Sequence, residues 1–204
     1  MPLQFWFEFA STYSYPAAMR IEGVAAAHGV EIEWDAFLLG PIFTAQGWDD
    51  SPFNIYPAKG RYMWRDLERI CDSAGIPFTR PSVFPRNSVL AARIATRFSQ
   101  APWLKEFVKT VYRANFVDDL DIGDRAVIAE CLRTVGADST SVIAEATLSE
   151  AKVLFRAQIE RAVQLGIFGA PSFVSNAELF WCNDRLQDAI EWHARTGSIS
   201  KTHD

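Results

Sequence analysis

Ser11 is the residue whose type and position most readily suggest chemistry. It follows a short apolar run at residues 3–9 and precedes a helical segment that opens near Pro16. The first backbone N–H groups of a helix have no partners, and the helix dipole favours negative charge at that end. A hydroxyl placed there can donate to an anion such as a thiolate and favour its charged form. The same position also suits a helix cap, as does that of Ser14.

Residues near the C-terminal end form a second group of candidates. Pro171 follows Ala170 and opens an apolar run, a place where a strand tolerates proline. Asp184 and Arg185 open the last helical segment, where a carboxylate suits an amino group and helix N–H groups suit a carboxylate. Asp184 has an ordinary alternative use as an N-cap.

A third group lies in the middle of the chain. Asn54 and Lys59 could contact a carboxylate or a peptide, although a lysine on an exposed helix face is usually a solvated charge. Arg86 and Asn87 are candidates for orienting a substrate, with capping of the next helix as an equally good use for Asn87.

Five segments together resemble the 2-hydroxychromene-2-carboxylate isomerases, relatives of kappa-class glutathione transferases in the thioredoxin-like superfamily. They are FASTYSY at 9–15, PAKGRY at 57–62, FPRN at 84–87, GAPSF at 169–173 and WCNDRL at 181–186. The likeness covers nearly the whole chain in the family's order. It departs from the family at Cys182, where glycine is common and would allow a positive φ or a close approach.

The resemblance implies a site for glutathione. Ser11 would donate to the glutathione sulfur, which leaves Ser14 as the cap of the helix. A cis bond before Pro171 would turn the Ala170 backbone towards the cysteinyl part of glutathione for strand-like hydrogen bonds. The segment with Asn183, Asp184 and Arg185 would hold the γ-glutamyl end. Asn54 and Lys59 would contact the glycyl carboxylate or the peptide.

The elements that must position these residues can be read from periodicity and turn signals. Residues 3–9 and 30–37 read as strands on either side of a helix at 17–28, which is a βαβ unit. Residues 40–57 read as a loop. Helices are predicted at 58–74, 88–99, 102–115, 125–135, 139–146 and 149–165. Strands at 171–174 and 178–181 and a helix at 184–194 follow.

The predicted fold class is therefore α/β. It is a thioredoxin-like domain with a large all-helical insertion between the N-terminal βαβ unit and the C-terminal ββα unit. We expect a single domain over residues 1–204, with the insertion at about 40–165, because 204 residues only slightly exceed the usual range for one domain.

Composition narrows the classes of function. A net charge of −5 with interspersed signs argues against nucleic acid or a membrane surface as a partner. The three cysteines Cys71, Cys131 and Cys182 are far apart, which argues against a disulfide framework, and His28, His193 and His203 near helix ends or in the tail give no reason to expect a metal. We expect a cytoplasmic protein, and family likeness suggests a homodimer.

The leading functional hypothesis is a glutathione-dependent isomerase. Its substrate would be 2-hydroxychromene-2-carboxylate, converted to trans-o-hydroxybenzylidenepyruvate, or a related aromatic 2-oxo acid. Arg86 or Arg61 is a candidate to pair with the substrate carboxylate. The alternatives are a kappa-like glutathione transferase acting on other electrophiles, a thiol–disulfide oxidoreductase and a glutathione-binding protein without activity. The oxidoreductase needs a thiol between Ser11 and Ser14, and none is present.

Overall fold

The computed structural model describes residues 1–199, so residues 200–204, including His203, lie outside the described part of the chain. Its centre is a four-stranded mixed sheet in the order β2-β1-β3-β4. The strands are β1 (Leu3–Phe7), β2 (Ile32–Ala36), β3 (Ser172–Ser175) and β4 (Glu178–Trp181). β1 is parallel to β2 and antiparallel to β3, and β3 is antiparallel to β4. The N-terminal and C-terminal parts of the chain therefore share one sheet, as predicted.

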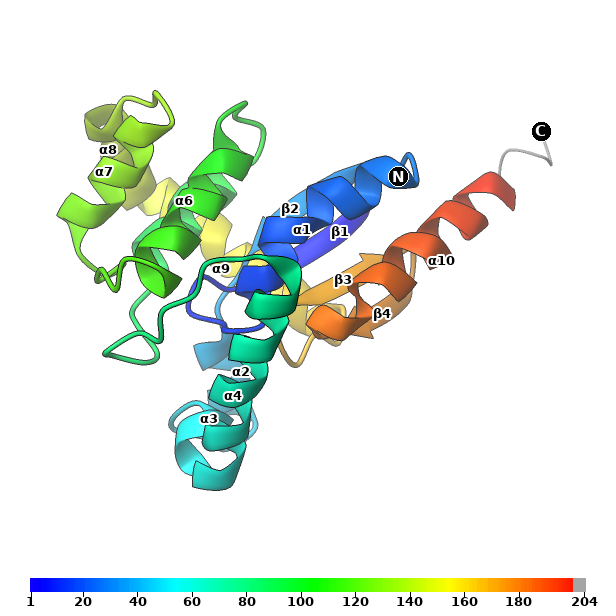
Figure 1. Ribbon diagram of the computed structural model, residues 1–204. Helices are drawn as coiled ribbons and strands as arrows, with labels where there is room; N and C mark the ends of the chain where they lie inside the picture. Colours follow the sequence, from blue (N-terminus) through cyan, green and yellow to red (C-terminus); the bar gives the residue numbers. More distant parts are fainter. Residues whose placement is uncertain (200–204) are drawn as a thin grey trace.

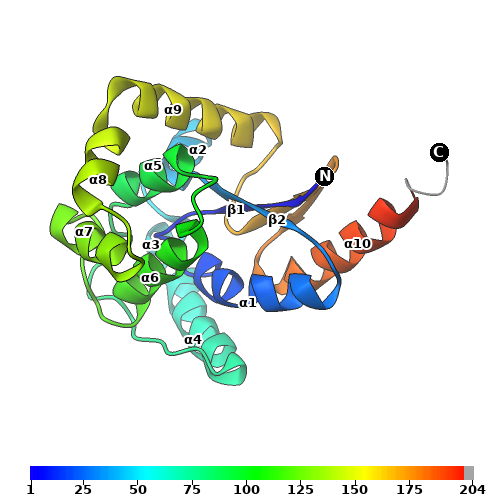
Figure 2. The same ribbon diagram turned by 90° about the horizontal axis from the view of Figure 1, so that it is seen from above.

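Helices cover both faces of this sheet. Figure 2 shows α1 (Ser14–Ala27) and α10 (Leu186–Ile199) on one side and α9 (Ser149–Gln164) on the other. β1 alternates between these layers: Phe5 and Phe7 belong to the larger core cluster with α1, whereas Trp6 packs with Phe37 and Ala162. A strand buried on both faces explains the continuous apolar run at the start of the sequence.

The segment between the two parts of the sheet is helical, which confirms the predicted insertion. Besides α9 it contains α2 (Leu39–Ala45), α3 (Pro52–Ile55), α4 (Pro57–Ala74), α5 (Val89–Arg97), α6 (Leu104–Phe116), α7 (Arg125–Thr134) and α8 (Ser139–Thr147). Figure 1 shows α3 and α4 extending below the sheet, and α6, α7 and α8 grouped at the upper left of the view.

Several predicted boundaries need correction. Residues 40–57 contain α2 and α3, so the prediction of an uninterrupted loop was wrong. β1 ends at Phe7 because the chain turns there, and the Ser11 N–H donates to the Glu8 carbonyl at 3.0 Å. α1 begins three residues earlier than predicted, with Pro16 in its first turn, where proline costs no hydrogen bond.

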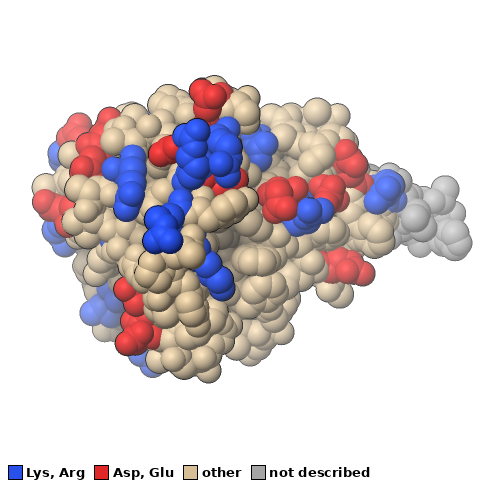
Figure 3. Space-filling view, turned by 60° about the horizontal axis from the view of Figure 1, so that its bottom comes forward, with Lys and Arg blue, Asp and Glu red and all other residues tan. Residues whose placement is uncertain are grey.

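Charge is distributed without a dominant sign over the face shown in Figure 3. Lys and Arg side chains gather on one part of it, Asp and Glu side chains lie beside them, and other residues cover a broad area. Among residues 1–199, no helix is both long and apolar enough to cross a membrane.

Asp35 on β2 is a buried acid beneath α9. Its Oδ1 accepts a hydrogen bond from Gln158 Nε2 at 2.7 Å and lies 3.9 Å from Arg161 Nη1, while its buried Oδ2 has no partner among the described residues. Burial raises the pKa of Asp35 from 3.8 to about 6. The folded state therefore binds this proton more tightly than the unfolded chain does.

We predict that Asp35→Asn makes the protein more stable at neutral pH. The wild-type contribution is present at about pH 4 and below and is lost as pH rises through about 6, which costs ~3 kcal/mol by linkage. Burying an unpaired amide reduces the gain of the variant to about 1–2 kcal/mol. Urea unfolding of the wild type and of Asp35→Asn between pH 4 and 7 measures this difference in the free energy of unfolding. Parallel pH profiles would contradict the prediction, and the exposed Asp72→Asn serves as the control.

Candidate functional site

The turn after β1 forms part of the wall of a cavity of about 1190 Å³. Four other parts of the chain complete this wall: the segment with α2 and α3, α4 as far as Ile70, the chain at Phe84 and Pro85, and the loops on either side of the β3–β4 hairpin. Of the residues predicted for the site, Ser11, Lys59, Ala170, Asn183 and Asp184 line this cavity. The structure thus brings together residues that are far apart in the sequence.

Ser11 connects the turn after β1 to the loop before β3. Its side chain is buried, with 8% of the residue exposed. The hydroxyl donates to the Ala170 carbonyl at 3.0 Å and accepts from the Ser14 N–H at 3.3 Å. Ser11, and not Ser14, therefore satisfies an N–H group at the start of α1, and the prediction that Ser14 is the cap was wrong. The Ser14 hydroxyl is buried without a hydrogen-bond partner in the described chain.

The Ala170–Pro171 peptide bond is cis. No hydrogen bond in the described part of the chain uses the Ala170 N–H, and the Ala170 carbonyl accepts only from Ser11. The Pro171 carbonyl accepts from the Cys182 N–H at 2.8 Å, which fixes the loop against the end of β4. Ala170 thus offers an unpaired backbone donor at the cavity wall, two residues before the strand β3 begins.

Cys182 has a φ of +83°, a conformation that L residues rarely adopt. The sequence raised this possibility, because related sequences commonly carry glycine there. Burial raises the pKa of the Cys182 thiol to about 11, so it is protonated at neutral pH. Although this thiol lies in the cavity wall, it is a poor nucleophile in that state.

The three residues after Cys182 form a short 3-10 turn, η1 (Asn183–Arg185), before α10. Asn183 is buried, and its Oδ1 accepts from Arg20 Nη2 at 2.8 Å, which ties the turn to α1. Asp184 is exposed at the cavity edge. Arg185 does not line the cavity and instead pairs with Asp184 at 3.1 Å and with Asp188 at 2.6 Å.

Lys59 on α4 and Asn54 on α3 differ in their relation to the cavity. Lys59 lines it, and its Nζ is 4.7 Å from the centre of the Tyr56 ring. Asn54 does not line it. Its amide nitrogen donates to the Asp50 carboxylate at 3.0 and 3.2 Å and to the Phe84 carbonyl at 3.2 Å, so Asn54 supports the loops around the cavity.

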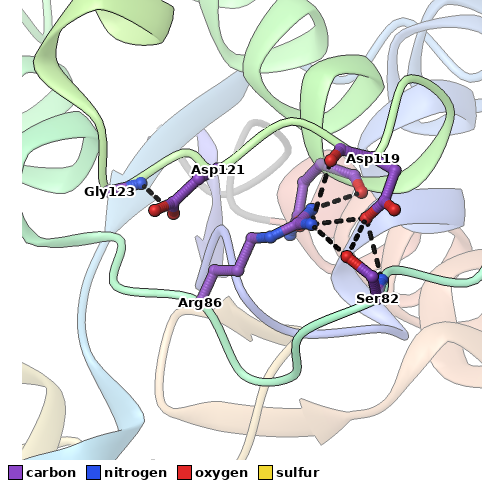
Figure 4. A network of polar contacts seen from close by, with 6 residues as sticks. Ser82, Arg86, Asp119, Asp121 and Gly123 are labelled. Carbon is purple, nitrogen blue, oxygen red and sulfur yellow. Dashed lines mark hydrogen bonds and ion pairs between the residues drawn. The ribbon is translucent and has the colours of Figure 1, made fainter.

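Arg86 lies outside the cavity wall, in a polar network with 7% of the residue exposed (Figure 4). It donates to the carbonyl and side-chain oxygens of Asn115 at 3.2 and 3.1 Å, to Ser82 Oγ at 3.3 Å, and to the carbonyl and carboxylate of Asp119. Asn115 Nδ2 in turn donates to the Phe9 carbonyl at 3.2 Å. Arg86 therefore supports the chain two residues before Ser11 and has no free face for a substrate.

We predict that Arg86→Met destabilises the protein by about 3 kcal/mol, because it leaves the two buried acceptor oxygens of Asn115 unpaired. Denaturant unfolding measures this loss. If the protein turns over a substrate, KM measured for the folded fraction is expected to stay within a factor of two. A large rise in KM without loss of stability would instead support the substrate-binding role considered for Arg86 from the sequence.

Asn87 is likewise absent from the cavity wall, and its Oδ1 accepts from the Val89 N–H at 3.0 Å, at the start of α5. This bond matches the capping use considered for Asn87. Arg61 is exposed on α4 and also does not line the cavity. None of the residues considered for a substrate carboxylate therefore reaches the cavity.

Glu8 is a residue of the cavity wall that was not predicted from the sequence. It lines the cavity, with 6% of the residue exposed. Oε1 accepts from the Ala10 N–H at 3.2 Å and from the Ser88 hydroxyl, and Oε2 accepts from the Leu39 N–H at 3.2 Å. Burial without a cation raises the pKa of Glu8. The sequence signal that could have identified Glu8 is its position as the one acid in the apolar run at residues 3–9.

Aromatic side chains make up much of the remaining wall. They are Tyr13, Phe43, Trp48, Phe53, Tyr62, Phe84, Phe168 and Trp181. Tyr13 is held by a hydrogen bond of 3.0 Å from its hydroxyl to Asp66. Trp181 is 48% exposed and contacts the Phe168 ring in a tilted arrangement. It also lies over Gly169, where a Cβ would be only 2.2 Å from Trp181 Nε1. Glycine at 169 thus allows an indole ring to form the edge of the cavity.

The ionisable groups around the cavity are mostly acidic. Lys59 is the single lysine or arginine in the described lining, which also contains Glu8, Asp49, Asp50, Asp66 and Asp184. The lining has no histidine, and residues 1–199 contain no cluster of three or more His, Cys, Asp or Glu side chains suited to a metal. The arrangement can hold a thiol at Ser11 and an aromatic molecule beside it.

Comparison with known proteins places the chain in a family. Residues 2–191 match the DSBA-like thioredoxin domain. A 2-hydroxychromene-2-carboxylate isomerase from Sphingobium xenophagum is 27% identical over 185 residues, which cover 90% of this chain and 93% of the relative. These matches confirm the resemblance that the motifs indicate.

Two solved structures have the same fold. A 2-hydroxychromene-2-carboxylate isomerase has a TM-score of 0.83 at 24% identity, covering 99% of this chain and 97% of that chain. A cytosolic disulfide reductase from Pseudomonas aeruginosa, solved with GSH, has a TM-score of 0.65 at 14% identity, covering 98% and 100%. The predicted thioredoxin-like fold class is confirmed, and this chain belongs to the DSBA-like thioredoxin domain family.

Proposed function

We propose that this protein is a glutathione-dependent isomerase of a conjugated aromatic carbonyl compound. The observation that carries the proposal is the pairing of the Ser11 hydroxyl with Ala170, next to a cis proline, in the wall of a large cavity. The curated relatives named 2-hydroxychromene-2-carboxylate isomerase support the class of reaction.

The residues in the wall fit glutathione by their chemistry. The Ala170 N–H is a free donor beside Ser11, as strand-like pairing with a cysteinyl residue requires. Asp184 and the backbone N–H groups at the start of α10 suit the amino and carboxylate groups of the γ-glutamyl end. Lys59 supplies a positive charge for the glycyl carboxylate. Asn54, Asn183 and Arg185 would act by holding the adjoining loops.

Bound glutathione would supply a thiolate that adds to a conjugated double bond, allows rotation about it and then leaves. Ser11 would donate its hydroxyl hydrogen to the sulfur in place of the Ala170 carbonyl, and the start of α1 would favour the negative charge. The aromatic side chains of the wall would hold the ring of the substrate and exclude water. The substrate to test first is 2-hydroxychromene-2-carboxylate, as the sequence suggests.

A kappa-like glutathione transferase is a second candidate, and one observation favours it. Lys59 is the single basic side chain of the described lining, so a glycyl carboxylate held there leaves no cation for a substrate carboxylate. Electrophiles without a carboxylate would avoid that conflict. Thiol–disulfide exchange is disfavoured, because Ser11 replaces the thiol that it needs and the Cys182 thiol has a raised pKa.

Two measurements test these proposals. Calorimetric titration with glutathione should give saturable binding, and no heat at millimolar glutathione would reject a glutathione function. An ultraviolet assay on 2-hydroxychromene-2-carboxylate should then show isomerisation that requires glutathione in catalytic amounts. A stable conjugate with an electrophilic aromatic halide, without isomerisation, would favour transfer. The homodimer and the cytoplasmic location remain predictions, of which sedimentation equilibrium tests the first.

A further inference from the structure

A second hollow lies between α9 and α5 and has a volume of about 800 Å³. Residues at i, i+3, i+4, i+7, i+8, i+11 and i+12 of α9 form one of its walls. The segment around Leu38 and the first turns of α5 form the other. The lining residues are Leu38, Pro41, Val89, Arg93, Lys152, Phe155, Arg156, Ile159, Glu160, Val163 and Gln164. We call it the α5–α9 groove.

The charges in the α5–α9 groove are predominantly positive. Arg93, Lys152 and Arg156 line it together with one acid, Glu160. None of the three cations takes part in an ion pair within residues 1–199. Arg93 Nε is also buried and has no hydrogen-bond acceptor among the described residues. The half-buried Arg93 guanidinium lines the groove without a carboxylate partner among the described residues, so it offers a positive charge there for an anionic group.

The rest of the lining is apolar. Leu38, Val89, Phe155 and Ile159 contribute hydrocarbon or aromatic surface, and Val163 is 56% exposed beside them. Apolar surface next to unpaired cations suits a molecule with both an apolar body and an acidic head. A second copy of this chain would bring its own three cations towards these and meet repulsion.

The α5–α9 groove is separate from the main cavity, although the two share a partition. Leu38 and Pro41 line the groove, while Leu39 and Gly40 line the main cavity. None of the residues from 38 to 41 lines both hollows. Ser11 and Ala170 line only the main cavity. A ligand in the groove would therefore leave the proposed glutathione site open.

We propose that the α5–α9 groove binds a small organic anion, a carboxylate or sulfonate with an aromatic or acyl body. Arg93 holds the acidic head through its terminal guanidinium nitrogens, Arg156 and Lys152 add charge, and the apolar wall takes the body. This site does not depend on the proposed isomerase activity.

Fluorescence titration with anilinonaphthalene sulfonate tests this site, with the main cavity filled by saturating S-hexylglutathione. We expect one saturable site per chain. Arg93→Gln and the exposed Arg156→Gln should each raise Kd about tenfold, equivalent to ~1.4 kcal/mol. Arg65→Gln, an exposed arginine on α4, is the matched control and should leave Kd unchanged. Thermal melts establish that each variant is folded. If Arg93→Gln does not fold, the Kd of Arg156→Gln decides the outcome.

Three results would overturn the proposal. They are an unchanged Kd in Arg156→Gln, complete displacement of the probe by S-hexylglutathione, and a dimer that Arg156→Gln dissociates while exposing the groove to the probe. The last would mean that a second copy covers the groove, and sedimentation velocity detects it. Failure of glutathione to bind at all would reject the proposed function but leave the probe result valid, because the probe is also titrated without the glutathione analogue.

Discussion

Ser11→Ala is expected to lower kcat/KM for the glutathione-dependent reaction by about 10²–10³-fold, the usual loss when one hydrogen-bond donor to a developing or bound anion is removed. The hydroxyl of Ser11 is the side-chain donor that lies beside the free Ala170 N–H. Alanine cannot donate to a sulfur there. It also leaves the Ser14 N–H and the Ala170 carbonyl without their partner, so each rate is corrected for the folded fraction.

The pKa of the bound thiol separates this role from simple support of the turn. If Ser11 favours the thiolate, the ultraviolet absorbance of bound thiolate should titrate at a higher pH in Ser11→Ala than in the wild type. KM for glutathione should change less than kcat, because the backbone of Ala170 remains. An unchanged thiolate titration together with reduced stability would mean that Ser11 only caps α1.

Ser14→Ala is the matched control, since it makes the same chemical change three residues away. The Ser14 hydroxyl is buried without a partner, so its removal is expected to leave activity unchanged and stability equal or slightly higher. If Ser14→Ala lost as much activity as Ser11→Ala, the loss would come from packing of the turn and not from a specific donor.

The elements that carry the candidate site were largely predictable, because their signals are local. Local residue patterns alone predict the strand at 3–9, the helix after it and the two strands at 171–174 and 178–181. These predictions need no information about the rest of the chain. At Cys182 the resemblance left two uses open for the family's glycine, a close approach or a positive φ, and the structure shows the positive φ.

Other features depend on contacts between distant segments and could not be read from the sequence. α2 and α3 are short helices in a segment rich in Gly, Pro and Asp, which has no helical periodicity to detect. Arg86 was open to a substrate role until the structure showed Asn115 and Asp119, which are about thirty residues away, around its guanidinium group. Hydrogen bonds of this kind decide whether a charged residue is available to a ligand.

Glu8 shows how such contacts hold the turn with Ser11 in place. Its carboxylate accepts from Ala10 on the turn, Leu39 at the start of α2 and Ser88 before α5, and its carbonyl accepts from the Ser11 N–H and the Tyr112 hydroxyl. Four separate segments therefore meet at this one residue. No cation takes part, so hydrogen bonds alone offset the cost of burying the acid.

Glu8→Gln is expected to be strongly disruptive despite its similar shape. A glutamine has one acceptor oxygen, whereas Oε1 faces the Ala10 N–H and Oε2 faces the Leu39 N–H. In either orientation its NH₂ group must therefore oppose a backbone N–H. The buried donor that loses its acceptor should cost about 2 kcal/mol in the free energy of unfolding. The displaced turn should lower kcat/KM as well.

Urea unfolding and steady-state kinetics at neutral pH measure both effects of Glu8→Gln. Glu31→Gln makes the same change at an exposed position next to β2 and should alter neither quantity. A free energy of unfolding within about 0.5 kcal/mol of the wild type, the range of an ordinary surface substitution, would contradict the role assigned to Glu8. Both N–H groups need an acceptor whether or not Glu8 is protonated, so the loss of stability should persist at mildly acidic pH. If the loss disappeared there, the charge of Glu8 and not its hydrogen bonds would be responsible.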